Sequence, residues 1–588
     1  MEAHAKSLAF IGNEGRIRIP FFQRGYVWED KNWEDLISEL LNFKRNHFLG
    51  SLILKQQKPV SGEPKEVLVI DGQQRLTTLS ILLKAIHDLF SEELQEVTKT
   101  TIKTYLFFKK NQTDKNYILK LQHSHIDTLA YKKVIESSGL LHSLDSINKD
   151  SSKILRCYKF FVEYLQGVDE ESRKQLFNEL LDDNNKILVV IDLSDRDNEQ
   201  AIFDTINSAG VRLSSADIIK NSLFQKALLL FENQDEVIEL YETTWKQTFL
   251  IDDSTMQFWD SERTTGRLMR DNIEILLHSI SVIDGFYDPD KHTLADLGDL
   301  YKAKIELISE ASEIEKLIIE VCSYAKIYRE HIATFDSTAL LSFDDLLRRL
   351  LHILDTLQIT TFHPFILFVL KNQQDESLRN KIFKQLERFV VRRLITNADT
   401  KGYNKICKEF IESLDSLEKK SIEKNDSELA TGLKRIENKP AALLLFWVEL
   451  YRRRNDAKFD VKELKYSYSL EHVMPQKWEQ YWATIPPKIK ADGTIMSQEE
   501  AIRDRYEKVY SIGNMTLLTT SLNSSLRNFE FSRKVEGEGR KKGIKQYASL
   551  SLTADDIVKP YDLGDKVWDE HKMAMRTDKL TSEILAIW

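Results

Sequence analysis

Cysteine is scarce in this chain of 588 residues, which contains only Cys157, Cys322 and Cys407. Three cysteines this far apart exclude a disulfide framework and a zinc site built from Cys-x-x-Cys pairs. Long apolar runs are also missing, since none approaches the roughly 20 residues of a membrane-spanning helix, and residues 1–10 lack a signal-peptide core. The sequence therefore predicts a cytoplasmic protein that does not enter a membrane.

Proline is unevenly distributed, and none of the ten prolines lies between residues 65 and 288. Because proline interrupts helices, a long proline-free stretch rich in Leu, Ile, Lys and Glu is typical of helical structure. Four short β-like runs lie in this stretch or before it: Arg16–Ile19, Ser51–Lys55, Val67–Ile70 and Ile187–Ile191. The predicted fold class is α+β, with helix dominant.

A strand, a tight polar turn and a helix are predicted around residue 71. Val67–Ile70 runs into Asp71-Gly-Gln-Gln-Arg75, and apolar residues at helical spacing follow as far as Phe90. The first N–H groups of a helix have no intrahelical acceptor, so the turn is a natural anion site. Gly72 would allow close approach of a ligand, and Arg75 would offer two hydrogen bonds to a phosphate. The alternative is an Asp N-cap with solvated Gln and Arg side chains.

A second polar cluster lies further along the chain. Asn207-Ser-Ala-Gly210 ends one helical pattern, and Ser214-Ser-Ala-Asp217 resembles a capping box that opens the next helix. Capping explains the serine and the aspartate, but it does not explain Asn207 and Lys220 in the same short stretch. The aromatic segment Phe21–Trp28, which precedes both clusters, is expected in the core or in a lid rather than as a base-stacking surface.

These segments together resemble a known domain. Phe22-Gln-Arg24, Asp71-Gly-Gln-Gln-Arg75, Ile202–Asn207 and Asp217–Asn221 are similar to the ParB-like domain of modification-dependent restriction proteins of the GmrSD type. The resemblance implies a sensor that binds, and often hydrolyses, a nucleoside triphosphate, either GTP or ATP. The chain has no P-loop sequence, so any hydrolysis is of another kind. The residues expected to bind nucleotide are Gln23, Arg24, Asp71, Gly72, Gln73, Gln74, Arg75, Asn207 and Lys220.

The C-terminal part carries a second set of candidate catalytic residues. Glu471 and His472 end a β-like segment, Asn514 follows about forty residues later, and Asn523 comes nine residues after it. Phosphodiester hydrolysis needs a base with a near-neutral pKa and a divalent cation. His472 suits the base, and the oxygens of Glu471 and Asn523 suit Mg²⁺ or Mn²⁺ rather than a soft metal. Asn514 is predicted to orient the imidazole.

This pattern resembles the ββα-metal HNH nuclease domain at the C-terminus of the same GmrSD-type proteins, and that of RNA-guided DNA-cleaving effectors. The resemblance implies that Glu471 and Asn523 bind metal, that His472 is the general base and that Asn514 positions it. Asn523 stands where many HNH proteins have a histidine, and it still offers an oxygen ligand.

Positive charge gathers just beyond these residues, although the whole chain is acidic. The 83 basic and 92 acidic residues give a net charge of −9, which taken alone argues mildly against a nucleic-acid binder. Between Arg527 and Lys545, however, seven basic residues accompany three glutamates. Beside a nuclease site such a segment is expected to contact DNA phosphates, with Arg527 and Lys534 as the predicted contacts.

We predict three domains: residues 1–234 as the ParB-like domain, 235–440 as a helical spacer and 441–588 as the HNH nuclease domain. The spacer contains the amphipathic patterns Leu340–Leu357 and Ile382–Ile395, which carry four arginines on their polar faces, and most of these are expected to be ordinary solvated charges. The four arginines are Arg348, Arg349, Arg392 and Arg393.

The resulting interpretation is a nucleotide-regulated, modification-sensing DNA endonuclease of antiphage defence, with nucleotide and modified DNA as partners. Two alternatives remain open, a nucleotide-controlled DNA-binding module with an inactive HNH domain and an RNA-directed nuclease toxin. The sequence leaves the oligomeric state open, including a homodimer.

Overall fold

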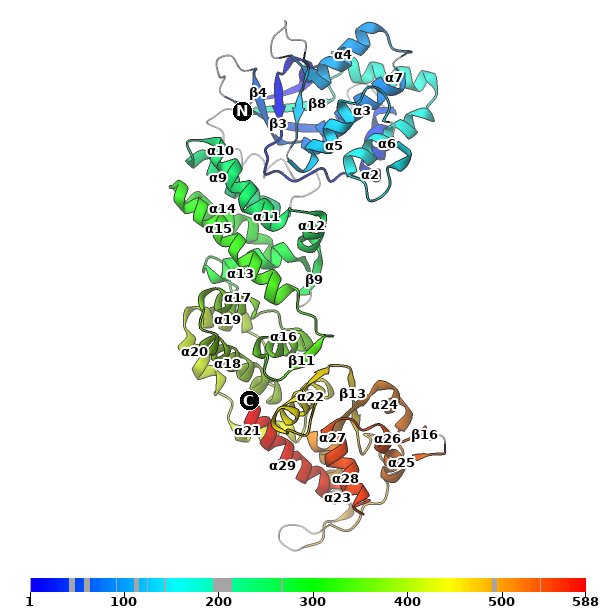
Figure 1. The fold of residues 1–588 in the computed structure, drawn as a ribbon, viewed down its shortest axis with the longest axis vertical. Coiled ribbons are helices and arrows are strands. Elements are labelled where there is room, and N and C mark those ends of the chain that lie inside the picture. Colours follow the sequence, from blue (N-terminus) through cyan, green and yellow to red (C-terminus); the bar gives the residue numbers. More distant parts are fainter. Residues whose placement is uncertain are drawn as a thin grey trace. The chain divides into compact units, whose positions relative to one another are not determined.

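The computed structural model describes residues 2–41, 48–57, 64–90, 92–109, 116–123, 125–141, 144–193, 214–265, 268–488, 494–539 and 541–588. They divide into two units, Met1–Glu242 with Ser309–Ala311, and Thr243–Ile308 with Ser312–Trp588. The fold is α+β and mostly helical, as predicted (Figure 1).

A six-stranded mixed sheet lies in the first unit, in the order β1-β8-β3-β4-β2-β7. Its strands are β1 (Glu2–Lys6), β2 (Arg16–Arg18), β3 (Gly50–Gln56), β4 (Glu66–Asp71), β7 (Leu121–Gln122) and β8 (Leu188–Leu193). Strand β3 is antiparallel to β4 and parallel to β8, whereas β2 is parallel to β4. The four predicted runs are thus confirmed as strands of one sheet, and the two edge strands were not predicted.

Both faces of the sheet are apolar. Leu52 and Leu54 of β3 belong to the main core cluster, whereas Ile53 and Ile70 belong to a smaller cluster. Because side chains alternate between the two faces of a strand, continuous apolar runs in the sequence reflect burial on both sides.

Helix α3 (Gln73–Phe90) is the central helix of the first unit. Every residue from Leu76 to Ile86 is buried, so the helix is enclosed on all sides. The spacing of its apolar residues had predicted an amphipathic helix with one buried face. Around it lie α2 (Asp30–Leu41), α4 (Glu96–Leu106), α5 (His125–Ile135), α6 (Lys153–Gln166) and α7 (Glu170–Leu181) (Figure 1). The unit also contains α1 (Phe10–Asn13), η1 (Leu144–Ser146), α9 (Ser215–Leu230) and most of α10 (Gln234–Thr243).

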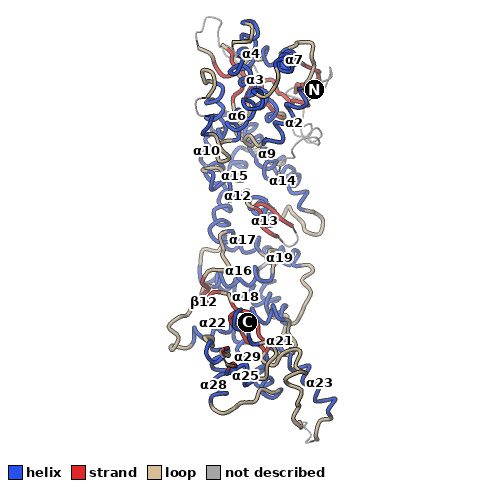
Figure 2. The backbone as a smooth tube through the Cα atoms, turned by 90° about the vertical axis from the view of Figure 1, so that its right-hand side faces the viewer, coloured by secondary structure: helices blue, strands red, loops and turns tan. Residues whose placement is uncertain are grey.

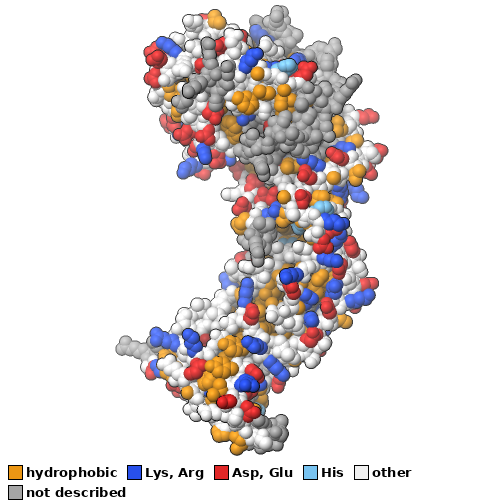
Figure 3. Space-filling model, turned by 180° about the vertical axis from the view of Figure 1, so that it is seen from behind, with side chains coloured by type: hydrophobic (Ala, Val, Ile, Leu, Met, Phe, Trp, Pro, Cys, Tyr) orange, Lys and Arg blue, Asp and Glu red, His pale blue; other side chains and the backbone are white. Residues whose placement is uncertain are grey.

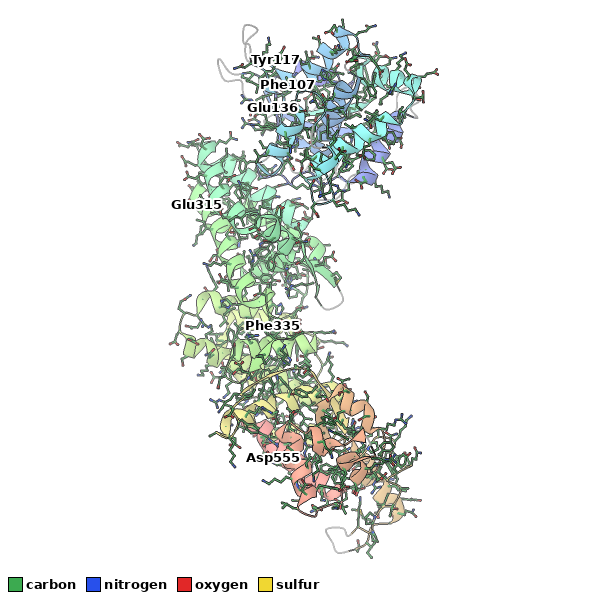
Figure 4. The ribbon with its side chains drawn as sticks, turned by 45° about the vertical axis from the view of Figure 1, so that its right-hand side comes forward. Phe107, Tyr117, Glu136, Glu315, Phe335 and Asp555 are labelled. Carbon is green, nitrogen blue, oxygen red and sulfur yellow. The ribbon has the colours of Figure 1, made fainter. Side chains whose placement is uncertain are left out.

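A short ribbon of β5 (Phe107–Phe108) and β6 (Ile118–Leu119) follows α4. The rings of Phe107 and Tyr117 lie together, with centroids 6.1 Å apart (Figure 4). The ammonium groups of Lys103 and Lys109 lie 4.4 and 4.9 Å from the Tyr117 ring, so cation–π contacts add to the packing of this ribbon.

The second unit is dominated by helices. Its first part contains α11 (Trp245–Phe249), α12 (Asp253–Asp260), α13 (Asn272–Ile283), η3 (Leu294–Asp296), α14 (Leu297–Glu306), α15 (Ala311–Ile327), η4 (Tyr328–Ala333), α16 (Leu346–Leu357), α17 (His363–Asn372), α18 (Glu376–Ile395), α19 (Tyr403–Glu412), α20 (Leu414–Ser421) and α21 (Asp426–Leu433). A hairpin of β9 (Glu262–Thr265) and β10 (Leu268–Asp271) lies beside α13 (Figure 2). Strand β11 (Leu340–Ser342) pairs with β12 (Glu463–Lys465).

The C-terminal part of this unit begins with α22 (Asn438–Asn455), and the boundary predicted at residue 440 falls in its first turn. The elements that follow are β13 (Tyr468–His472), α23 (Gln498–Val509), η5 (Ile512–Asn514), β14 (Met515–Thr519), α24 (Thr520–Leu526), α25 (Phe531–Glu536), β15 (Gly537–Glu538), β16 (Lys541–Lys542), α26 (Ile544–Tyr547), α27 (Ser551–Thr553), η6 (Ala554–Val558), α28 (Lys559–Asp562) and α29 (Glu570–Ile587).

Two of the arginines predicted to be solvated are buried instead. Arg349 is 2% exposed and donates to Glu387 at 2.9 Å. Arg392 is 3% exposed and donates to the backbone oxygen of Trp588 at 2.6 Å and to Asp426 at 2.8 Å. The prediction was wrong because helical periodicity shows which residues share a face, and not whether another helix covers that face.

Charged side chains of both signs are mixed on the surface. In Figure 3, Lys and Arg side chains lie among Asp and Glu side chains over the helices of the second unit. Within the part of the chain that the structure describes, no helix combines the length and the apolar character needed to cross a membrane.

Candidate functional site

The Asp71–Arg75 turn joins β4 to α3, as the sequence predicted. Gly72 has a φ angle of +90°, and a Cβ atom at this position would lie 2.3 Å from Leu52 Cδ2. Both the backbone conformation and the lack of space therefore require glycine. Asp71, directly before this glycine, supplies a carboxylate, and Arg75, three residues after it, supplies a guanidinium.

Arg75 lies against the first residues of β3. Its Nη1 donates to the backbone oxygen of Ser51 at 3.1 Å. A Cβ atom on Gly50, whose φ is +130°, would lie 2.3 Å from the central carbon of the guanidinium. Gly50 therefore leaves the space that Arg75 occupies. Burial lowers the pKa of Arg75, while Asp71 and Glu39 act in the opposite direction.

The amides of Gln23 and Gln74 hold the loop that carries Arg24. Gln23 Nε2 donates to a backbone oxygen of β4 at 2.8 Å. Gln74 donates to Gly25 O at 3.0 Å and accepts from Val27 N at 2.8 Å. Both glutamines are buried, so in this structure they position the loop. Ligand contact through either amide, and through Gln73, stays a prediction.

Five charged side chains connect the turn to the second polar cluster. Asp71 interacts electrostatically with Arg75 and Arg24, and Arg24 also interacts with Asp217. Lys220 Nζ donates to Asp217 Oδ1 at 3.0 Å. Burial raises the pKa of Asp71, against the effect of the two arginines. The tertiary fold thus brings three cations and two carboxylates from distant parts of the sequence into one network.

Other predictions for this region have different outcomes. Ser214 Oγ accepts from Asp217 N at 3.1 Å, so the predicted helix cap is confirmed. Phe21 and Phe22 are buried against Phe224, which confirms a core role. Asn207 lies outside the described residues.

One supporting residue was missed. The carboxylate of Asp127 accepts from Tyr26 N at 2.7 Å, and burial raises the pKa of Asp127 to about 6. Asp127 lies in α5, about a hundred residues further along the chain, and this hydrogen bond fixes the loop that follows Arg24. No motif surrounds Asp127, so the sequence contains no signal that would have identified it.

The second candidate site is built on β13, β14 and α24. The two strands are antiparallel, with Glu471 opposite Thr516 and His472 opposite Met515. Helix α24 follows β14 directly, which gives a strand–strand–helix arrangement. Glu471 and His472 thereby lie at the end of β13 that pairs with the start of β14, whereas α24 begins at the opposite end, beyond Thr519.

Asn523 on α24 is anchored to the strand that carries Glu471. Its Nδ2 donates to Leu470 O at 2.8 Å and to Ser469 Oγ at 2.9 Å. Both amide hydrogens are therefore used, and no donor among the described residues pairs with the amide oxygen. The oxygen is left for a ligand.

Lys534, which we predicted to bind DNA, is fully buried. Its Nζ donates to Glu471 Oε1 at 2.5 Å and to His472 O at 3.0 Å. That prediction was wrong, because a side chain with 0% exposure cannot reach a phosphate. Lys534 is instead the internal counter-ion of Glu471. Burial raises the pKa of Glu471, and the ammonium opposes that rise. Arg527 is exposed and stays a predicted DNA contact.

Asn514 does not orient the imidazole as predicted. It is fully buried, and its Nδ2 donates to Met474 O at 2.8 Å and to Val509 O at 3.0 Å. Its Oδ1 accepts from Met474 N at 2.9 Å and from Trp568 Nε1 at 3.1 Å. These four bonds use the whole capacity of an amide, so none remains for His472. Asn514 holds the loop that follows the histidine.

His472 carries an imidazole whose pKa lies below the near-neutral value predicted for the base. Its Nε2 lies 3.4 Å from the side-chain nitrogen of Gln476. Burial, with a further contribution from Lys534, lowers the pKa of His472 to about 4. The ring is therefore neutral at physiological pH, and one ring nitrogen is available as a base.

The oxygens of Glu471 and Asn523 are the ligand type that Mg²⁺ prefers. Magnesium commonly takes one or two protein ligands and keeps several waters. Within the described ranges, no three His, Cys, Asp or Glu side chains are grouped to hold a metal, so water would complete the coordination. The oxygens of Glu471 and Asn523 fit Mg²⁺ once the Glu471 carboxylate leaves its hydrogen bond with Lys534 Nζ.

Substitution of Asn514 by alanine is expected to destabilise the second unit by about 3 kcal/mol, because buried hydrogen-bonding groups lose their partner. Thermal unfolding should show a melting temperature lower by several degrees. The matched control is Asn455→Ala, which removes an exposed amide at the end of α22 in the same unit and should leave the melting temperature nearly unchanged. Equal effects of the two substitutions would contradict the assignment of Asn514 as the residue that holds the loop.

Comparison with protein families places both sites within known domains. Residues 8–224 match the model of the GmrSD restriction endonuclease N-terminal domain, and residues 392–583 match that of the GmrSD restriction endonuclease C-terminal domain. A curated relative, the uncharacterized protein MJ0686 of Methanocaldococcus jannaschii, is 26% identical over 266 residues. The alignment covers 38% of this chain and 42% of that protein, so this chain spans less than half of its relative.

Proposed function

This chain belongs to the GmrSD restriction endonuclease family, and from that premise we propose that it is a DNA endonuclease of antiphage defence that acts in the cytoplasm. In this proposal a ParB-like N-terminal domain binds a nucleoside triphosphate and controls a C-terminal HNH nuclease that cuts modified DNA. The observation that carries the nuclease assignment is the arrangement of Glu471, His472 and Asn523 on two strands and the following helix.

The N-terminal domain binds the triphosphate at the Asp71–Arg75 turn. Arg24 and Arg75 interact electrostatically with carboxylates of this network, and Lys220 donates to Asp217. A triphosphate supplies several anionic oxygens that accept from these cations, while Asp71 and Asp217 keep the cations in position. The start of α3 offers backbone N–H groups that have no intrahelical acceptor. GTP and ATP both satisfy this chemistry.

The nuclease uses a neutral imidazole and two oxygen ligands. His472 takes the proton of the attacking water, while Glu471 and Asn523 hold Mg²⁺ or Mn²⁺. The bound ion supplies stabilisation of the charge that develops on the phosphate and on the leaving oxygen. In the absence of metal, Lys534 compensates the charge of the Glu471 carboxylate within the buried site. Arg527, exposed just beyond α24, contacts a DNA phosphate.

The proposal is tested by offering the purified chain modified and unmodified plasmid DNA, with Mg²⁺ and with GTP or ATP. We expect nicked or linear modified plasmid with Mg²⁺ and intact plasmid with EDTA, because the metal is required for the cut. Agarose electrophoresis reads the cleavage, and phosphate release reads nucleotide hydrolysis in the same samples. Binding of DNA without any cut would favour the inactive-nuclease alternative. Cleavage of RNA in preference to DNA would favour the toxin alternative.

A further inference from the structure

A cavity of about 360 Å³ lies in the helical part of the second unit, away from the residues assigned above. It is enclosed by α13, by the segment that follows α13, by the start of α17 and by α19. Its polar lining includes Arg270, His278, Tyr287, His292, Thr361 and His363. The described side chains that line it include no carboxylate. A cavity of this size holds one small molecule.

The β9–β10 hairpin supplies positive charge to this region. Arg270 and Arg263 are directly opposite each other across the two strands. Like charges in such a pair are destabilising unless an anion compensates them. Arg270 Nη1 donates to Glu274 at 3.3 Å, whereas its buried Nε finds no acceptor among the described residues. The arginine therefore has unused capacity to bind an anion.

Three imidazoles add hydrogen-bond donors to the same cavity. His292 Nδ1 accepts from the backbone N–H of Asp288 at 2.9 Å, so the neutral ring carries its proton on Nε2. Within the described ranges, no hydrogen bond to another residue is made by the rings of His278 and His363. Burial lowers the pKa of both rings to about 4, with Arg270 acting on His278 and Arg263 on His363. The neutral imidazoles of His278 and His363 therefore offer N–H groups close to the charges of Arg270 and Arg263.

Apolar and aromatic side chains line the cavity beside the histidines. Tyr287 packs edge-on against His278, with ring centroids 4.6 Å apart. Ile275, Val282 and Leu294 also line the space. A bare inorganic anion would leave these apolar side chains uncovered, whereas a phosphorylated molecule with a flat organic part would contact both them and the polar groups.

We propose that this cavity binds a small phosphomonoester of the nucleoside monophosphate class, with its phosphate beside Arg270 and the histidines and its organic part against Tyr287. The ligand accepts from Arg270 Nε and pairs the imidazoles of His278 and His363. The site is separate from the triphosphate site proposed for the first unit, because every residue that lines it belongs to the second unit.

The test is calorimetric titration of the full chain with 5′-GMP, with 5′-AMP and with inorganic phosphate, without DNA. Arg270→Gln should weaken binding of the monophosphate at least tenfold. Arg435→Gln, which changes an exposed arginine of the same unit, should leave the affinity unchanged. Arg75→Ala should also leave this binding event unchanged, since it alters only the first unit. The readout does not depend on cleavage, so failure of the nuclease assignment would not affect it.

Asn404→Trp provides a second variant in case Arg270→Gln impairs folding. Asn404 is exposed on α19 at the edge of the cavity, where a bulky ring should obstruct entry without disturbing the core. We expect the same loss of affinity, at least tenfold, at an unchanged melting temperature. Unchanged monophosphate binding in both variants would overturn the proposal. So would loss of the binding event in Arg75→Ala, which would assign the ligand to the first unit.

Discussion

His472→Ala should abolish DNA cleavage and leave nucleotide hydrolysis measurable. Loss of a general base typically slows a reaction by about 10²–10⁴-fold, which places cleavage below detection in a plasmid assay. Nucleotide hydrolysis is assigned to residues of the other unit, so it should continue. The measurement is plasmid cleavage and phosphate release on the same protein preparation, with Mg²⁺ present.

His571→Ala is the matched control for this experiment. His571 is exposed on α29 of the same unit, so its removal should change neither activity. The imidazole of His472 contacts only Gln476 by hydrogen bonding among the described residues, and His472→Ala should therefore fold normally. Cleavage by His472→Ala within tenfold of the unaltered chain would show that another group acts as the base.

Arg75→Ala should weaken nucleotide binding by about 10- to 100-fold. A charge-assisted hydrogen bond to a phosphate is worth about 1.5–3 kcal/mol, and the guanidinium offers two. Gly50 and Ser51 hold this side chain in place, so little conformational entropy is lost when a ligand binds. Asp71→Ala should act in the same direction, because Asp71 aligns both Arg24 and Arg75.

Isothermal titration with GTP and with ATP measures this effect, and Arg156→Ala is the control. Arg156 lies on α6 of the same unit and pairs with Asp30 at 3.2 Å, outside the charged network. Its replacement should leave the affinity unchanged. If Arg75→Ala and Asp71→Ala both bound nucleotide as the unaltered chain does, the assignment of the turn would be rejected.

Local features of the chain could be predicted because each depends on neighbouring residues. The four strands of the main sheet follow from apolar runs, and the turn before α3 follows from a glycine between a strand and a helical pattern. The cap at Ser214 follows from its spacing to Asp217. The edge strands β1 and β7 could not be predicted, because short polar segments become strands only beside a partner.

The roles of individual polar side chains could not be predicted in the same way. Lys534 belongs to a basic run and was expected at the surface, yet its ammonium lies inside the nuclease site against Glu471. Asn514 was expected to contact the imidazole, yet it holds the adjacent loop. Arg349 and Arg392 were expected in water and are buried. A charge run or a spacing shows which residue types are near each other, and not which of them another element covers.

The sequence by itself therefore determined the fold class, the family resemblance and a set of candidate site residues, because these depend on composition and on short-range order. Only the tertiary structure decided which side chains meet. It brought Arg24, Asp71 and Asp217 into one electrostatic network. It also directed both amide hydrogens of Asn523 to acceptors on β13, so that no donor among the described residues pairs with the amide oxygen. It also enclosed the cavity around Arg270, whose walls come from segments about a hundred residues apart. Contacts between distant segments depend on how helices and strands pack, and that packing is a property of the whole fold.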